Sequence, residues 1–285
     1  MTDSRAGGRR AAPASGGNEL VARVVSSLAL AAIALLGAFL GGWATAIVLA
    51  VVTAIVHLEW VSLTDRTPWP GAVFTAVLVL AIAMITMGLA TTGAMSLAIG
   101  GFTLVALAAV FSALTFSPWR PIGVAYAAML GVGLLILRLT PDGLPAVLLV
   151  LAVVWATDTG AFFAGRLIGG AKLSPDISPN KTWSGAIAGL VVGVVAGLVV
   201  IAFAGVPVSV PLVIIIALLS VASQAGDLFE SWVKRVFGVK DSGDIIPGHG
   251  GLLDRVDGLA AASGLAAIIG WLHGGMNIAM GLLLW

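Results

Sequence analysis

Nine apolar runs divide this chain, and most are close to the roughly 20 residues that an α-helix needs to cross a bilayer. Composition agrees with a membrane protein, because 60% of the residues are hydrophobic and 9% are charged, against about 25% charged in soluble domains. The sequence therefore predicts an all-α, polytopic membrane protein with about nine transmembrane helices. The predicted spans are 20–39, 41–58, 70–90, 95–116, 120–138, 143–168, 182–205, 210–237 and 254–273.

The chain is expected to have three regions. Residues 1–18 are rich in Gly, Ala, Ser and Arg, which is typical of a disordered segment, here a cytoplasmic N-terminus. Residues 19–140 are expected to be N-terminal transmembrane helices that provide a scaffold and lipid access. Residues 141–285 are expected to be a C-terminal transmembrane catalytic region. The chain has no cysteine, so any metal must be held by oxygen or histidine ligands.

The basic residues set the expected orientation. With nine spans, every Lys and Arg except Arg138 lies on the N-terminal side of the membrane. Positive charge favours the cytoplasmic face. We therefore expect an inner (cytoplasmic) membrane protein with a cytoplasmic N-terminus, an outside C-terminus and a cytoplasmic-facing active site. The loops at 169–181 and 238–253 then share one face and can meet.

Charge is concentrated around one loop, between the last two predicted spans. A segment this polar between membrane spans is costly unless it does chemistry at the membrane surface. Its charged residues are Asp227, Glu230, Lys234, Arg235, Lys240, Asp241, Asp244, Asp254, Arg255 and Asp257.

Four polar residues at the end of the eighth span share a helical face. Asp227, Glu230, Ser231 and Lys234 are spaced i, i+3, i+4, i+7. A Glu230–Lys234 ion pair one turn apart is the simpler interpretation. An unpaired carboxylate inside hydrocarbon is costly, so Asp227 must face protein, water or a cation.

Asp254 and Asp257 repeat this pattern at the start of the ninth span. Acidic residues also favour helix N-termini, which is the alternative interpretation. Two acids on one face, opposite a second acidic helix, indicate a hard divalent cation such as Mg²⁺, and one or two ions are compatible with the pattern.

The loop between these helices contains glycines that let backbone N–H groups approach a phosphate, although loop flexibility also explains them. His249 either donates to a phosphate or orders the loop. The residues in question are Gly248, His249, Gly250 and Gly251, beside Lys234, Arg235, Lys240 and Arg255.

The other loop offers Ser178, Lys181 and Thr182 as phosphate donors, with Thr182 as a candidate N-cap of the seventh helix. The alternative is an ordinary cytoplasmic loop.

Asp158 lies inside the sixth span and is a functional candidate, or else a buried acid paired with Arg166 or a lysine. Glu59 ends the second span, and the sequence assigns it no catalytic role.

These motifs resemble a known family. Ser231-x-x-Lys234-Arg235, Lys240-Asp241 and Pro247-x-His249-Gly250-Gly251-x-x-Asp254-Arg255-x-Asp257 look like the signature of phosphatidate cytidylyltransferase, also called CDP-diacylglycerol synthase. Asp158, Gly165-Arg166, Lys172 and Ile177-Ser178-Pro179-x-Lys181-Thr182-Trp183 are also similar to that family. Many members have Glu after the tryptophan, where this chain has Ser184.

The resemblance implies a nucleotidyltransferase of phospholipid biosynthesis. CTP and phosphatidic acid would give CDP-diacylglycerol and pyrophosphate with Mg²⁺ as cofactor, in the lipid bilayer and without a nucleic-acid partner. It also implies a homodimer. The implied metal ligands are Asp227, Asp254 and Asp257, with Asp158 and Asp244 as helpers. The implied substrate-binding residues are Ser178, Lys181, Thr182, Ser231, Lys234, Arg235, Lys240, His249, Gly250, Gly251 and Arg255.

Two alternatives stay open. The first is a related enzyme that uses CTP on another lipid, such as a polyprenol kinase. The second is an ion-coupled secondary transporter, which intramembrane acids also suit. Transporters usually show broken helices in two corresponding halves. Here the polar residues crowd into the C-terminal half, which favours an enzyme.

Overall fold

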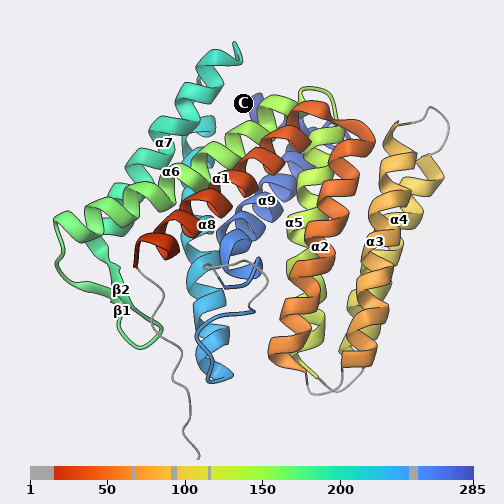
Figure 1. Ribbon diagram of the computed structural model, residues 1–285. Helices are drawn as coiled ribbons and strands as arrows, with labels where there is room; N and C mark the ends of the chain where they lie inside the picture. Colours follow the sequence, from red (N-terminus) through yellow and green to blue (C-terminus); the bar gives the residue numbers. More distant parts are fainter. Residues whose placement is uncertain (1–15, 66–67, 91–94, 115–116, 244–249) are drawn as a thin grey trace, which may run out of the picture.

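The computed structural model describes residues 16–65, 68–90, 95–114, 117–243 and 250–285. Within them the chain forms ten helices and one small hairpin (Figure 1). The elements are α1 (Gly16–Leu40), α2 (Gly42–Thr64), α3 (Pro68–Ala90), α4 (Met95–Ala113), α5 (Trp119–Leu139), α6 (Gly143–Leu167), β1 (Lys172–Ser174), β2 (Ser178–Thr182), α7 (Trp183–Phe203), α8 (Val210–Val236), α9 (Leu253–Gly274) and α10 (Ile278–Leu283).

The prediction of an all-α, polytopic membrane protein is confirmed. Eight helices of the described part, α2 to α9, are long and apolar enough to cross a membrane. The first predicted span corresponds to α1, in which Val24–Leu40 is a shorter apolar segment. The short helix α10 was not predicted. The predicted N-terminal segment 1–18 lies almost entirely outside the described residues, which begin at residue 16.

The loop predicted at 169–181 contains regular structure. β1 and β2 form a two-stranded antiparallel sheet, in which Lys172 pairs with Thr182 and Ser174 with Ser178. The sequence predicted a loop here because β1 and β2 are too short to show an alternating pattern, and because prolines lie in and beside them. The hairpin leads directly into α7.

The helix ends follow the predicted alternation. In Figure 1, α2, α4, α6 and α8 all end on the side of the molecule that carries the β-hairpin. Arg120, Arg166, Lys172 and Arg235 belong to element ends on this side, whereas Arg138 lies at the opposite end of α5. There it donates from Nε to the carbonyl of Ala38, 2.5 Å away, near the end of α1.

A stripe of glycines brings α6 and α7 close together. Gly185, Gly189, Gly193 and Gly197 recur every fourth residue of α7, and all are buried. A Cβ on Gly189 would lie 2.7 Å from the Thr157 carbonyl oxygen of α6, closer than such atoms approach. Small residues of this kind let membrane helices pack backbone to backbone. The contact places the Asp158 turn of α6 beside the start of α7.

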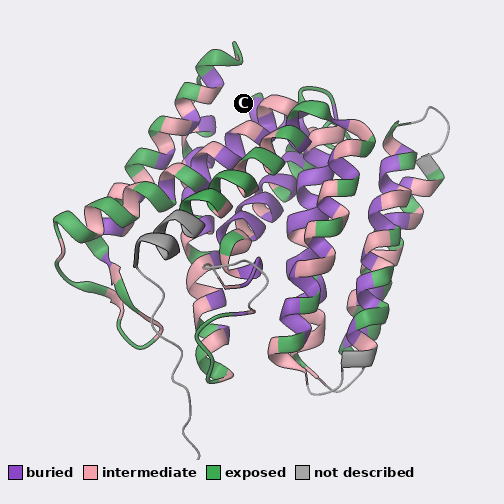
Figure 2. Ribbon diagram, in the orientation of Figure 1, coloured by how far each residue is buried: buried purple, intermediate pink, exposed green. Residues whose placement is uncertain are grey.

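The interior of the molecule lies around α5, which has the largest buried share of the membrane-spanning helices, and around the buried face of α9 (Figure 2). Aromatic rings connect neighbouring helices there, with Trp60 of α2 stacked on Tyr126 of α5 at a centroid distance of 5.6 Å and on Phe229 of α8 at 6.2 Å. The Tyr126 hydroxyl donates to the Asp257 carbonyl oxygen over 2.9 Å. The polar ends of α8 and α9 therefore pack against aromatic side chains of α2 and α5.

Candidate functional site

A polar cavity of about 750 Å³ lies between α6, the hairpin, α7, α8 and α9. Acidic and basic side chains face each other across it, and they come from segments about 100 residues apart in the sequence. We call it the polar cavity. Its charged lining residues are Asp158, Arg166, Lys172, Lys181, Asp227, Asp254, Arg255 and Asp257.

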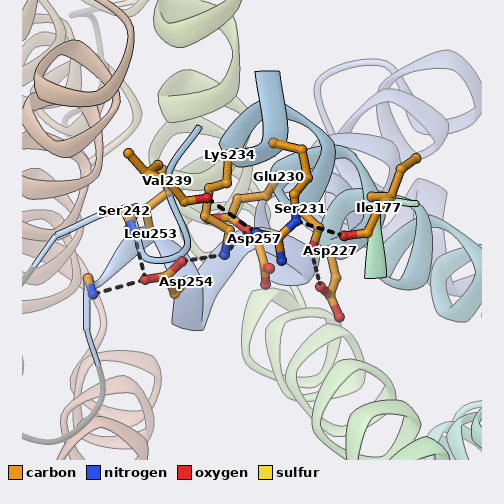
Figure 3. Close-up of polar contacts among 12 residues, drawn as sticks. Ile177, Asp227, Glu230, Ser231, Lys234, Val239, Ser242, Leu253, Asp254 and Asp257 are labelled. Atoms are coloured by element: carbon orange, nitrogen blue, oxygen red, sulfur yellow. Dashed lines mark hydrogen bonds and ion pairs between the residues drawn. The ribbon is translucent and has the colours of Figure 1, made fainter. Parts of the chain in front are cut away.

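Asp254 is the most connected of the acids (Figure 3). Its Oδ1 lies 2.6 Å from Lys234 Nζ, and its Oδ2 accepts hydrogen bonds from the backbone N–H groups of Ser242 at 3.1 Å and Gly251 at 3.0 Å. A single carboxylate thus joins α8, α9 and both ends of the charged loop that connects them.

Lys234 is shared between two acids. Its Nζ also lies 2.6 Å from Glu230 Oε2, and Glu230 is 1% exposed. The Glu230–Lys234 pair offered by the sequence is therefore present, and a second pair with Asp254 extends it. Lys234 contacts these acids and is not among the residues that line the polar cavity.

Asp227 connects α8 to the hairpin. Lys181 Nζ of β2 lies 2.6 Å from Asp227 Oδ2, and Ser231 Oγ donates to Asp227 Oδ1 over 3.5 Å. Arg235, two turns further along α8, donates from Nε to the Ile177 carbonyl oxygen over 3.2 Å. The hairpin in the loop predicted at 169–181 therefore contacts the last turns of α8, the helix that leads into the second predicted loop, through two side chains.

Glu59 caps the start of α9 from a helix that is distant in the sequence. Its Oε1 accepts the Leu252 N–H at 2.9 Å, and its Oε2 accepts the Leu253 N–H at 2.7 Å. The first N–H groups of a helix have no partner within it, so they need an external acceptor. A Cβ at Gly251 would lie 2.8 Å from Glu59 Oε2, which explains why glycine stands there.

Thr182 caps α7, as predicted. Its Oγ1 accepts the Gly185 N–H at 3.1 Å. Ser184 stands where the family that the motifs resemble often has Glu. Its hydroxyl lies 3.0 Å from Thr182 Oγ1 and donates to the Gly169 carbonyl oxygen. In this chain the residue after the tryptophan thus holds the hairpin closed, and carries no charge.

The structure places the other predicted residues as follows. Asp158 and Asp257 line the polar cavity. Among the described residues, Asp158 forms no ion pair with Arg166 or with a lysine. The Arg166 guanidinium lies 4.6 Å from the centre of the Phe162 ring, and Lys181 pairs with Asp227 instead. Ser178 lies in β2, and Lys240 and Gly250 lie in the described ends of the α8–α9 loop. Asp244 and His249 lie outside the described residues.

Several residues of the site were not among the candidate site residues. Gln224 lines the polar cavity one turn before Asp227, so the same helical face contained the signal. Asn180 lines it too, next to the predicted Lys181. Arg166 and Lys172 also line it, and both belong to the motifs that resemble the family. Glu59 could have been suspected only as an acid near a span end that needs a partner.

Whether the described residues fit Mg²⁺ depends on how their carboxylates are arranged. Within the described residues, no three His, Asp or Glu side chains are grouped closely enough to form a preassembled metal site. Asp227 and Asp254 each contact a lysine. Even so, four carboxylates line one cavity, and oxygen ligands are those that Mg²⁺ prefers. The residues fit a cation that takes its remaining ligands from water and substrate phosphates, as Mg²⁺ usually does.

The chain is similar in sequence to several curated proteins that have the same name. The phosphatidate cytidylyltransferase of Brucella suis biovar 1 (strain 1330) is 48% identical over 153 residues, which are 53% of this chain and 57% of that protein. The proteins of that name from Staphylococcus haemolyticus (strain JCSC1435) and Staphylococcus saprophyticus are 47% and 49% identical over 132 residues, 46% of this chain and 51% of each relative. The alignments thus span about half the length of these relatives.

A second comparison covers more of the chain. The model of the Cytidylyltransferase family matches residues 21–273, from α1 to the last turn of α9. This range includes both loops and every helix that contributes to the polar cavity. The chain therefore belongs to the cytidylyltransferase family.

Proposed function

We propose that this protein transfers the cytidylyl group of CTP to phosphatidic acid, giving CDP-diacylglycerol and pyrophosphate. The observation that carries the proposal is the polar cavity, in which four acids and four basic residues meet at the end of a membrane-spanning bundle. Both substrates are anionic at the phosphates that must react, so a site for them needs basic groups and cations. The relatives named phosphatidate cytidylyltransferase point to the same reaction.

In the proposed reaction an oxygen of the lipid phosphate attacks the α-phosphorus of CTP. A new P–O bond forms, the bond to the β-phosphate oxygen breaks, and pyrophosphate leaves with that electron pair. The attacking phosphate is already ionised, so no protein nucleophile or general base is needed. Catalysis then consists mainly of positioning and charge stabilisation, which the lining residues supply.

The residues divide into two groups. Lys181, Arg166, Lys172 and Arg255 line the polar cavity and would bind phosphates. Asp227, Asp254 and Asp257, with help from Asp158, would hold Mg²⁺, which supplies positive charge to the phosphates when bound. Lys234 would hold Asp254 in place between the two helices.

The test is direct. Purified protein in detergent or liposomes should convert labelled CTP and dioleoyl phosphatidic acid into equal amounts of CDP-diacylglycerol and pyrophosphate. EDTA should abolish the reaction, and added MgCl₂ should restore it. Product formed only with polyprenol acceptors would support the related lipid enzyme instead. CTP-independent solute flux without a liponucleotide product would support a transporter.

We propose further that the N-terminus and the polar cavity face the cytoplasm at the inner membrane. The basic residues at the hairpin end of the bundle support this orientation. Because the chain has no cysteine, single cysteines report topology cleanly. In intact spheroplasts an impermeant maleimide should label Val208→Cys, in the α7–α8 loop, and should label Asp176→Cys of the hairpin only after permeabilisation. The reverse pattern would overturn the orientation.

We also propose that the protein is a homodimer. Measurement of the molecular mass of the protein in detergent tests this.

A further inference from the structure

A buried hydrogen bond joins α6 to α8 beside the polar cavity. The hydroxyl groups of Thr157 on α6 and Ser220 on α8 lie 2.7 Å apart, and both residues are fully buried. α7 leaves room for this contact, because a Cβ on Gly193 would collide with Thr157 Oγ1. Three helices therefore meet at one polar contact between side chains.

This hydrogen bond lies close to two acids of the polar cavity. Asp158 directly follows Thr157 on α6. Asp227 follows Ser220 by about two turns of α8, a spacing that places both residues on one face of the helix. The bond therefore fixes, relative to each other, the two helix segments that present Asp158 and Asp227 to the polar cavity.

The acids themselves tend to push these segments apart. When they are ionised, Asp158 and Asp227 repel each other, and Asp257 of α9 repels both. Hydrogen bonds between side chains are among the interactions that hold membrane helices together. The bond between Thr157 and Ser220 thus holds α6 against α8 next to the place where the repulsion acts.

A second hydrogen bond holds the same face of α8. Gln224 lies between Ser220 and Asp227, and its Nε2 donates to the Ala186 carbonyl oxygen of α7 over 3.3 Å. Gln224 also lines the polar cavity, whereas Thr157 and Ser220 are not among its lining residues. The pair can therefore affect the reaction only through the position of the acids, and not by contact with a substrate.

Resting on the proposed function, we propose that Thr157 and Ser220 are positioning residues for the reaction. Their hydrogen bond sets the separation of Asp158 and Asp227, and with it the affinity of the polar cavity for the Mg²⁺ that accompanies the nucleotide. Loss of the bond weakens binding of the cation and leaves the groups that contact the lipid unchanged.

Single and double substitutions separate positioning from packing. Thr157→Val keeps the shape of the side chain and removes the partner of Ser220, and Ser220→Ala does the reverse. A buried hydroxyl that loses its partner destabilises a protein, whereas removal of both partners can be nearly neutral. The double variant should therefore regain most of the thermal stability that each single variant loses. It should not regain affinity for Mg²⁺, because the bond between the helices is absent in all three variants.

Initial rates measure the first effect. The Mg²⁺ concentration that gives half the maximal rate should rise about fivefold in all three variants, within the factors of about 3 to 18 that correspond to measured hydrogen bonds between membrane helices. The KM for phosphatidic acid should stay within twofold of wild type. Thr157→Ser keeps the hydroxyl and should behave as wild type. Thr86→Val is the matched control, because Thr86 is equally buried and donates to the Ile82 carbonyl oxygen within α3. It should leave the Mg²⁺ dependence unchanged.

Mn²⁺ binding gives a reading that does not depend on turnover. A CTP analogue with a methylene bridge between its α- and β-phosphorus cannot transfer the cytidylyl group, and in its presence electron paramagnetic resonance can measure free Mn²⁺. The dissociation constant for Mn²⁺ should be about fivefold higher in the two single variants and in the double variant than in wild type. Wild-type Mn²⁺ binding in the single variants, or its recovery in the double variant, would overturn the positioning role. Weaker Mn²⁺ binding in all three, without any CDP-diacylglycerol from wild type, would instead overturn the proposed function and keep the positioning of the acids.

Discussion

Asp254→Asn is expected to lower the rate of CDP-diacylglycerol formation by about 100- to 1,000-fold, as loss of one preorganised electrostatic group typically does. The amide has one acceptor oxygen where the carboxylate has two. If that oxygen keeps the N–H groups of Ser242 and Gly251, the amide NH₂ then faces the ammonium group of Lys234. The loop and α8 thus lose their common partner, and the polar cavity loses one of four negative charges. Initial rates with labelled CTP measure the effect.

The matched control for this change is Asp142→Asn. Asp142 lies at the other end of the bundle, before α6, and has a φ of 59°, a conformation that asparagine also tolerates. Its activity should stay within twofold of wild type. Gel filtration in detergent should show the same monodisperse peak for both variants. A rate near wild type for Asp254→Asn would contradict both the metal assignment and the central place of this carboxylate.

Glu59→Gln is expected to have the second largest effect, although Glu59 does not line the polar cavity. One of the two buried N–H groups, of Leu252 or Leu253, loses its acceptor and meets an NH₂ donor instead. An unsatisfied buried donor costs about 1–3 kcal/mol. Because α9 carries Asp254 and Asp257, the displaced helix start should also lower kcat by about tenfold. Thermal unfolding and initial rates measure the two effects.

The two consequences of Glu59→Gln can be separated. A loss of folded protein alone would lower the apparent rate but would leave the KM for CTP and the Mg²⁺ dependence unchanged. Displacement of the α9 start should shift both. Ser62→Ala, one turn further along α2, removes a hydroxyl that donates to the Glu59 carbonyl oxygen within the same helix, and it should change neither. Wild-type stability and rate in Glu59→Gln would show that the cap is dispensable.

The sequence predicted the parts of this fold that depend on local patterns. Every predicted apolar run corresponds to a helix, because a 20-residue apolar segment in a bilayer has few alternatives. Thr182 was identified as the cap of α7, since capping depends on residues only three positions apart. The face shared by Asp227 and Ser231 followed from helical spacing in the same way.

What the sequence could not give are contacts between distant segments. Glu59 bonds residues more than 190 positions away, and no local pattern links them. The Lys181–Asp227 pair has the same cause, because these two residues meet only when the hairpin folds against α8. The polar cavity depends on four helices and the hairpin at once, so it was not visible in the order of residues.

The hairpin gives the site a sensitivity that a purely helical wall would lack. Side chains alternate between the two faces of a strand, so a slip of one residue would turn Lys181 away from Asp227 and point Asn180 or Thr182 there instead. A single insertion or deletion in the turn at 175–177 would thus replace the charged Lys181 beside Asp227 with an uncharged side chain. The same change in the α7–α8 connection would alter only the length of a loop. The spacing of the hairpin, more than its composition, decides which side chain reaches Asp227.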